Sequence, residues 1–119
     1  MAEYDTAALA GLVGRAIARQ RIRCGFTQEQ IAERLGIGNE AVSRIERGLV
    51  MPNIERLLSL AEVFGCEAAD LLTEASARPQ DQARHLETRL ATLSAEDRQL
   101  VMELLESLIQ RLGRGCASD

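Results

Sequence analysis

The sequence predicts an all-α protein, and three observations support this prediction. Apolar residues make up 46% of the chain and aromatic residues only 3%, so the core must be aliphatic. Such a core suits packed helices better than a β-sandwich. There are only two prolines, Pro52 and Pro79, and there is no long alternating run of β-branched residues. At 119 residues the chain has room for one compact domain and an appendage.

Residues 6–72 are predicted to form one domain of five short helices, each with apolar residues on one face. Thr27 and Gln30 make a capping-box pattern before the second helix, and Asn53 is the expected cap of the fourth. The predicted helices are 6–23, 28–35, 39–47, 53–64 and 68–72, with glycines 25, 36, 48 and 65 following the first four. The fourth helix is expected to face the core with Ile54, Leu57, Leu58, Ala61 and Phe64.

The C-terminal third of the chain is predicted to be a separate helical segment. Residues 73–82 shift to small and polar side chains and are expected to be a linker. A helical hairpin or hook should follow over residues 83–112, with Ser94 and Asp97 capping a last helix that starts at Ala95, before a flexible tail, 113–119.

An apolar stripe runs along this C-terminal segment, and it would form an aggregation-prone patch if left in water. A second copy of the chain would cover it, so we expect a homodimer. The expected interface residues are Leu86, Leu90, Leu100, Val101, Leu104, Leu105, Leu108 and Ile109. The alternative is that the last helix folds back onto its own domain.

The stretch TQEQIAERLGIGNEAVSRIERG, residues 27–48, has the spacing of two short helices joined by a tight turn. Ala32 is small enough for the next helix to cross close to it, and Gly36 allows a backbone conformation that β-carbons disfavour. Val42 and Ile45, three residues apart, would hold the following helix on the core. The opposite face of that helix is polar and is expected to point to solvent; it consists of Asn39, Glu40, Ser43, Arg44 and Arg47.

This pattern resembles the helix-turn-helix of the Xre/Cro/C1 family, the fold of the lambdoid phage repressors and many bacterial regulators. The resemblance covers about residues 12–72. It rests on Thr27-Gln28, Ile31-Ala32, Gly36, Val42, Ile45, Glu46, Gly48 and Pro52. It implies a five-helix lambda-repressor-like domain whose third helix enters the major groove of double-stranded DNA.

The resemblance also implies roles for single residues. Base reading would fall to Asn39, Glu40, Ser43 and Arg44, phosphate binding to Thr27, Gln28 and Arg47, and a structural ion pair to Arg21 and Glu46. In two places the sequence departs from the family. Gly38 stands where a Ser or Thr is usual, so the cap is weaker or moves to Asn39, and Glu40 stands where the family often has an uncharged residue. In the free protein Glu40 and Arg44 could instead form an i,i+4 surface pair.

The net charge of −4 does not exclude DNA binding, which needs a basic face and not a basic protein. From Arg15 to Arg47 there are seven Arg and four Glu, which gives +3. This modest charge predicts few phosphate contacts per subunit, so two subunits should act together. For four further arginines the sequence allows two roles, either contacts to phosphates or ordinary solvated charges. They are Arg15, Arg19, Arg23 and Arg34.

The predicted function is therefore a sequence-specific transcriptional regulator, cytoplasmic and dimeric, that represses by occupying an inverted-repeat operator. The alternative is an antitoxin or partner-controlled interaction module that binds another protein through its C-terminal helices. With one His, His85, which is expected to be exposed, and no nucleophile motif, phosphate loop or metal-ligand cluster, we expect no enzyme, cofactor or metal site. No stretch of 18 apolar residues predicts a membrane segment.

The three cysteines form no CxxC or Cys/His metal pattern. Cys24 and Cys66 fall in apolar helical contexts and are expected to behave as small buried hydrophobes. Cys116, in the predicted tail, is the only thiol expected to be exposed.

Overall fold

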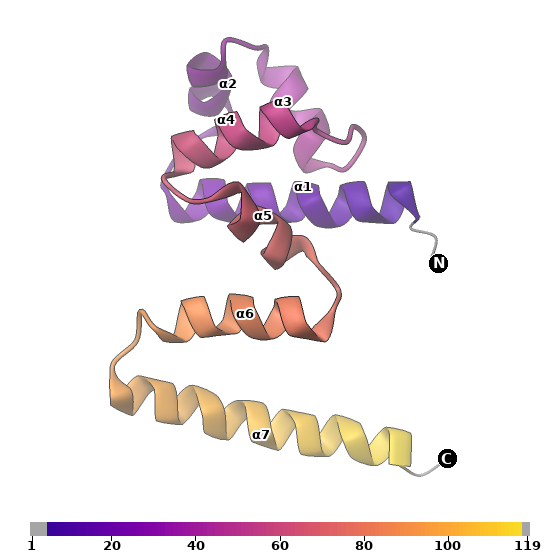
Figure 1. Ribbon diagram of the computed structural model, residues 1–119, viewed down its shortest axis with the longest axis vertical. Coiled ribbons are helices and arrows are strands. Elements are labelled where there is room, and N and C mark those ends of the chain that lie inside the picture. Colours follow the sequence, from indigo (N-terminus) through magenta and orange to yellow (C-terminus); the bar gives the residue numbers. More distant parts are fainter. Residues whose placement is uncertain (1–4, 118–119) are drawn as a thin grey trace. The chain divides into compact units, whose positions relative to one another are not determined.

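The computed structural model describes the backbone of residues 5–117 and the side chains of residues 5–113. Within this range every regular element is an α-helix, as the sequence predicted (Figure 1). The chain divides into two compact units, residues 1–85 and 86–119. The helices are α1 (Thr6–Arg23), α2 (Gln28–Leu35), α3 (Asn39–Glu46), α4 (Ile54–Phe64), α5 (Ala68–Ala75), α6 (Pro79–Leu90) and α7 (Ala95–Ala117).

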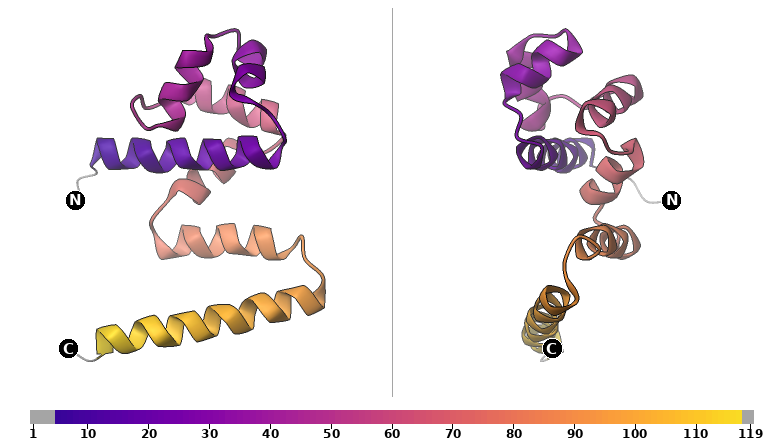
Figure 2. Two further views of the ribbon diagram at one scale, coloured as in Figure 1. Left: turned by 180° about the vertical axis from the view of Figure 1, so that it is seen from behind. Right: turned by 90° about the vertical axis from the view of Figure 1, so that its left-hand side faces the viewer.

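The first unit is built around α1, which contacts α3, α4 and α5. Figure 2 shows this long helix running beneath α2, α3 and α4. The largest side chains that are almost fully buried come from four different helices: Ile17, Ile31, Leu60 and Leu71. The core is thus aliphatic and shared among short helices, none of which could bury its apolar face alone.

Both ends of α2 have the chemistry that the sequence predicted. Thr27 accepts from the Gln30 N–H while the Gln30 side chain accepts from the Thr27 N–H, which completes the capping box. Gly36 ends α2 with φ +69°, a conformation that costs glycine little. The Ile37 N–H then bonds back to the Ala32 carbonyl at 2.9 Å, so the turn closes tightly and fixes where α3 begins.

A close approach between α1 and α3 depends on Gly14, which the sequence analysis did not single out. A Cβ added there would lie 2.4 Å from the carbonyl oxygen of Ile45 and 2.7 Å from that of Glu46. Any larger residue would therefore push α3 away from α1. The sequence did contain a signal, because Gly14 lies on the same helical face as the buried Ala10 and Ile17.

The structure corrects the predicted linker, because regular helix occupies most of residues 73–82. α5 continues to Ala75 and α6 begins at Pro79, which leaves only residues 76–78 between them. Proline is favoured in the first turn of a helix, where its missing N–H is not needed. Ser76 donates to the Asp81 carboxylate at 2.6 Å and also accepts from the Arg78 N–H, so side chains hold this short connection in place.

The predicted inner face of α4 was partly wrong. Ile54 and Leu58 are 76% and 56% exposed, and Leu60 is buried in their place. The run from Leu57 to Ala61 offers an apolar residue at nearly every position, so spacing alone does not fix which stripe faces inward. The side chains that are buried follow the spacing i, i+3, i+4, i+7: Leu57, Leu60, Ala61 and Phe64.

The prediction of two buried thiols was also wrong. Cys24 is exposed, because it caps the C-terminus of α1 beyond the last buried turn, and Cys66 is only partly buried after the end of α4. The prediction for Cys116 lies outside the side chains that the structure describes.

The second unit contains the end of α6 and all of α7. α7 begins at Ala95 as predicted, with the Asp97 N–H donating to the Ser94 hydroxyl at 3.2 Å. It runs on to Ala117, so residues 113–117 are helical and not part of a loose tail. Gly113 does not stop the helix because it is not in the left-handed conformation that ends α2 and α4.

The apolar stripe of α7 is largely solvent-accessible in the single chain. Its most exposed members among the expected interface residues are Leu100 at 57%, Leu104 at 58%, Leu108 at 54% and Ile109 at 62%. The other four, Leu86, Leu90, Val101 and Leu105, are partly buried. Among the described residues, no helix combines the length and the apolar character needed to cross a membrane.

Candidate nucleic-acid interface

The outer face of α3 presents the polar side chains that the sequence assigned to DNA. Asn39, Glu40, Arg44 and Arg47 are exposed and Ser43 is partly exposed. The inner face is anchored by Val42 and Ile45, which are 2% and 7% exposed. α3 is therefore fixed to the core by one face and exposed to solvent on the other.

The N-terminus of α3 begins without a side-chain cap. Gly38 is the N-cap residue and has an extended backbone, and no side chain bonds to the first turn. Of the two possibilities raised by the missing Ser or Thr, the weaker cap is the one observed, and the cap does not move to Asn39. The Asn39 amide has no hydrogen bond to any described residue, so both its donor and its acceptor remain available.

Glu40 forms an ion pair with Arg47 and not with Arg44. Glu40 Oε1 lies 3.3 Å from Arg47 Nη2, two helical turns away on the same face, and both side chains are more than half exposed. Such surface pairs contribute about 0–1 kcal/mol. Arg44 forms no hydrogen bond or ion pair within the described part of the chain, which leaves its guanidinium free to bind a ligand.

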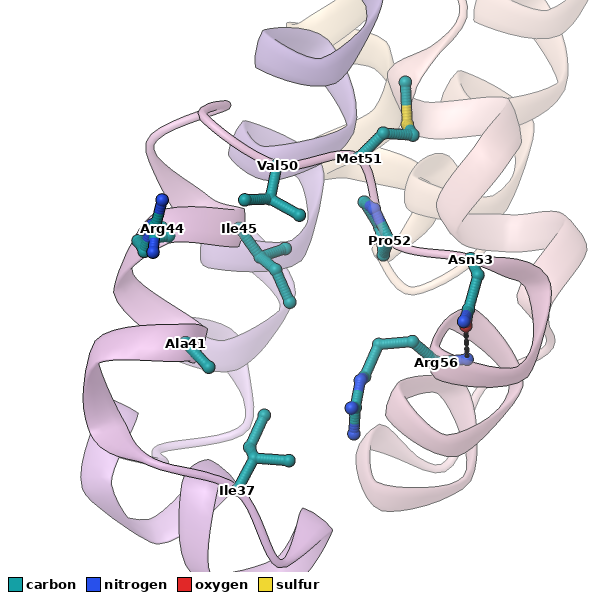
Figure 3. A pocket seen from close by; sticks show the side chains of 9 residues that line it. All are labelled: Ile37, Ala41, Arg44, Ile45, Val50, Met51, Pro52, Asn53 and Arg56. Atoms are coloured by element: carbon teal, nitrogen blue, oxygen red, sulfur yellow. Dashed lines mark hydrogen bonds between the residues drawn. The ribbon is translucent and has the colours of Figure 1, made fainter.

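Beside α3 there is a hollow of about 300 Å³ between this helix and the start of α4 (Figure 3). Ile37, Ile45 and Val50 contribute apolar side chains to its lining, and Arg44 and Arg56 contribute two guanidinium groups. The Arg56 backbone N–H donates to the Asn53 side chain at 2.8 Å, while its side chain points toward α3. Since neither arginine has an ion-pair partner among the described residues, this side of α3 carries local positive charge.

The ion pair expected between Arg21 and Glu46 is present and is bidentate. Arg21 Nε and Nη2 lie 2.7 and 3.1 Å from the two carboxylate oxygens of Glu46, and Arg21 Nη1 also donates to the carbonyl of Phe26. The two side chains are only 16% and 6% exposed. The pair connects the end of α1 to the end of α3, so it fixes the position of α3 on the domain.

Gln28 is part of the same cluster. Its Nε2 donates to Glu46 Oε1 at 2.9 Å, so the side chain that the sequence assigned to a phosphate is already oriented by α3. The capping box uses the N–H groups of Thr27 and Gln30, and the Ile31 N–H bonds to the Thr27 carbonyl. In the described part of the chain, this leaves the backbone N–H groups of Gln28 and Glu29 as the free donors at the start of α2.

Two of the four arginines left open by the sequence are structural. Arg19 and Arg23 on α1 bond to Glu74 on α5 at 3.0 and 2.8 Å, and Glu74 is only 5% exposed. Arg34 stacks over the ring of Phe26, 4.7 Å from its centroid. Sequence reasoning missed Glu74, because it fell in the predicted linker, about 50 residues away from its partners.

The surroundings of Glu74 shift the pKa of its carboxyl group. Burial raises its pKa, but hydrogen bonds from Arg19 and Arg23 and the Arg23 charge lower the pKa by more, so the pKa lies below its usual value. His85 Nε2 is 3.9 Å from the same carboxylate and its side chain is 32% exposed, so His85 is less exposed than predicted. Among the described residues, no group of three or more His, Cys, Asp and Glu side chains is placed to hold a metal ion.

The fold and the exposed face of α3 together define a helix-turn-helix DNA-binding domain. Comparison with known proteins agrees, because a helix-turn-helix family model matches residues 17–71. The HTH-type transcriptional regulator y4dJ of Sinorhizobium fredii is 35% identical over 68 residues, which are 57% of this chain and 88% of that protein. The chain therefore belongs to the Xre/Cro/C1-type helix-turn-helix family and is a DNA-binding transcriptional regulator.

Two further relatives extend the comparison beyond the DNA-binding domain. The CTXphi transcriptional repressor RstR of Vibrio cholerae is 22% identical over 91 residues, 76% of this chain and 82% of its own length. The crystal structure of the clp gene regulator ClgR from Corynebacterium glutamicum matches with a TM-score of 0.56 and 27% identity, over 71% of this chain and 87% of that one.

Proposed function

We propose that this regulator is a repressor that binds an inverted-repeat operator as a homodimer, with α3 of each subunit in the major groove. The observation that supports it most is the outer face of α3, where Asn39, Glu40 and Arg44 are exposed on a helix whose other face is buried. A protein bound to an operator within a promoter would block transcription by occupying the site. The similarity to RstR, a transcriptional repressor, favours this direction of control.

In the proposed complex Arg44 reads guanine and Glu40 reads cytosine. Arginine donates bidentately to guanine O6 and N7, and a carboxylate accepts from the cytosine N4 amine. Arg44 has no partner to give up, whereas Glu40 must leave Arg47. Because the Glu40–Arg47 pair is exposed and weak, that exchange costs little. Asn39 and Ser43 lie beside these two residues on α3 and complete the proposed base-reading set.

Phosphate contacts would come from Thr27, Gln28 and Arg47. The free N–H groups at the start of α2 and the positive end of its helix dipole would bind one phosphate, with Gln28 held in place by Glu46. Arg47, once released by Glu40, would bind a second phosphate at the end of α3. These contacts position the domain and carry no sequence information.

The proposed dimer forms through α7. Leu100, Leu104, Leu108 and Ile109 are each more than half exposed in the single chain, and an apolar patch of this kind is unfavourable in water. A second copy of the chain would cover these side chains. Their burial would stabilise the dimer by about 1.5–3 kcal/mol per large side chain. Two α3 helices would then be held about 34 Å apart, one turn of DNA, as an inverted repeat requires.

Selection of bound DNA from a random pool, followed by a salt titration, tests DNA reading. We expect an enriched palindrome and an affinity that falls as salt rises. Arg44→Ala should then cost about 1–3 kcal/mol and relax one guanine position, whereas Gln28→Ala should weaken all sequences about equally. Arg89→Ala removes the same charge from a residue that does not belong to the helix-turn-helix domain, and it is the control. Failure to enrich any palindrome would rule out the proposed operator.

Light scattering tests the dimer. Leu104→Asp with Leu108→Asp should halve the mass while circular dichroism shows the helical content retained. Leu58→Asp is the matched control, because this leucine is equally exposed but lies on α4. A change in fold without loss of mass would contradict the dimer through α7.

The exposed stripe on α7 also fits a second function, that of an antitoxin or partner-controlled module. An apolar helix face binds a partner helix of another protein by the same packing. If the purified chain is monomeric by light scattering and still binds DNA weakly, the stripe is then available to a different protein, and this second function is favoured over the homodimer.

A further inference from the structure

Two cysteines lie at the junction between the C-terminal end of α1 and the C-terminal end of α4. Cys24 caps the C-terminus of α1, and Cys66 follows Gly65, which caps the C-terminus of α4. The Cys24 thiol donates to the carbonyl oxygen of Phe64, with Sγ 3.6 Å from that oxygen. Cys66 is thus only two residues beyond the atom that Cys24 touches, and both thiols are free.

The backbone holds Cys66 at this place. Gly65 adopts φ +70° and the Cys66 N–H bonds back to the Ala61 carbonyl at 3.0 Å, so the chain turns back at the end of α4 and does not extend away. Phe64 and Cys66 are two residues apart, so their Cα atoms lie within about 7 Å of each other, and Cys66 lies near the carbonyl that the Cys24 thiol contacts. A disulfide between Cys24 and Cys66 requires their Cα atoms to lie about 4.4–6.8 Å apart.

The surroundings give the two thiols different reactivity. Burial raises the pKa of Cys66, and the charges of Asp70, Cys24 and Glu74 raise it further, against a smaller opposite effect of Arg23. Cys24 is exposed and reaches solvent first, whereas Cys66 stays protonated and partly covered.

We propose that Cys24 and Cys66 form a redox modification site, in which a peroxide converts the two thiols into a reversible disulfide. The Cys24 thiolate attacks a peroxide oxygen, the O–O bond breaks, and Cys24 becomes a sulfenic acid as the first water leaves. Cys66 then attacks the sulfenic sulfur, the S–S bond forms, and the second water leaves. The two thiols lose two electrons and two protons, and one hydrogen peroxide is reduced to two waters.

The disulfide would close a loop of the chain that includes α2, α3 and α4. Residues 24–66 contain α2, α3 and α4, so the disulfide would join the start and the end of this segment across the α1–α4 junction. Such a link restricts the unfolded chain. Formation of the disulfide does not require DNA binding, so it can be tested independently of the proposed operator.

Mass spectrometry of the full chain tests the site. Cys116→Ser removes the third thiol, and the purified protein is treated with hydrogen peroxide and digested with trypsin. The intact mass should fall by about 2 Da, the mass of two hydrogen atoms. The peptide of residues 24–34 should be found linked to that of residues 57–84, and a thiol reductant should restore both.

Two variants in the same background serve as controls. Cys24→Ser and Cys66→Ser should each abolish the link, and the circular dichroism of both should match that of the parent because neither thiol belongs to the buried core. With Cys66→Ser, Cys24 should gain oxygen or form covalent dimers. The proposal is overturned if the parent protein gains oxygen without losing hydrogen, or if its disulfides join Cys24 to Cys24 of a second chain.

Discussion

α4 and α7 both carry leucines at helical spacing, but only α4 buries them in its own chain. Leu57 and Leu60 of α4 are 8% and 1% exposed, whereas Leu104 and Leu108 of α7 are 58% and 54% exposed. α4 contacts α1, α2 and α5, which cover its inner face. The difference teaches that periodicity identifies an amphipathic helix but does not say what covers it. For α4 the cover is the domain core, and for α7 we propose a second copy of the chain.

The largest expected effect comes from a substitution in the buried face of α4. Leu60→Ala removes a side chain that is 1% exposed and should lower the free energy of unfolding by about 2–5 kcal/mol in urea titrations. Leu58→Ala, on the same helix but 56% exposed, should change it by no more than about 0.5 kcal/mol. Equal losses in the two variants would mean that the buried face of α4 has been assigned wrongly.

The second effect removes the charge that fixes α3 to α1. Glu46→Gln breaks the bidentate pair with Arg21 and weakens the bond from Gln28, and should cost about 2–3 kcal/mol of unfolding free energy. Arg21 keeps its bond to the Phe26 carbonyl, which limits the loss. Urea denaturation measures it, and a change below about 0.5 kcal/mol would show that the pair does not hold the helices together.

A third effect depends on pH, because the pKa of Glu74 is lowered in the folded protein. A lowered pKa contributes stability that is present above the unfolded value of 4.5 and is lost as pH falls through the folded value. Wild type should exceed Glu74→Gln by about 1–2 kcal/mol at neutral pH. This difference should shrink toward zero in acid.

Urea titrations of both proteins at several pH values would measure this difference. Because the two proteins differ only at residue 74, the difference reports on Glu74 and its contacts. A difference that stays constant down to about pH 3 would contradict the role of the Arg19 and Arg23 bonds.

The smallest expected effect concerns the exposed ion pair between Glu40 and Arg47 on α3. Glu40→Gln removes the bond to Arg47, and should change the unfolding free energy by less than about 1 kcal/mol because both side chains are mostly solvated. Differential scanning calorimetry against wild type should show nearly the same melting temperature. A large loss would instead make Glu40 a structural residue and remove it from the proposed reading set.

Most of the first unit was predictable from the sequence because its helix boundaries have local chemistry. The predicted caps act within one turn of the helix ends that they stabilise. At the N-termini these are the Thr27–Gln30 capping box and Asn53, and at the C-termini they are Gly36 and Gly65; the structure confirms all of them. The region around Pro79 was not predictable, because proline fits both a loop and the first turn of a helix. In the structure Pro79 begins α6, and the hydrogen bond from Ser76 to Asp81 stabilises this helix start.

The candidate site was predictable to a similar extent. The exposed face of α3 follows from helical geometry once Val42 and Ile45 are known to be inside. The partners of its charged groups do not follow, because spacing allowed Glu40 to pair with Arg44 and the structure pairs it with Arg47. Arg19 and Arg23 likewise needed a carboxylate from α5, which no local pattern connects to α1.

The sequence by itself determined the helical class, most helix ends and the family, since caps, glycine turns and the spacing of apolar residues act over a few residues. Only the tertiary structure decided which stripe of α4 is buried, that Gly14 is the point where α1 meets α3, and that Glu74 connects α1 to α5. It also showed that Cys24 is exposed beside the end of α4. These features depend on residues far apart in the chain, whose contacts exist only after the helices have packed.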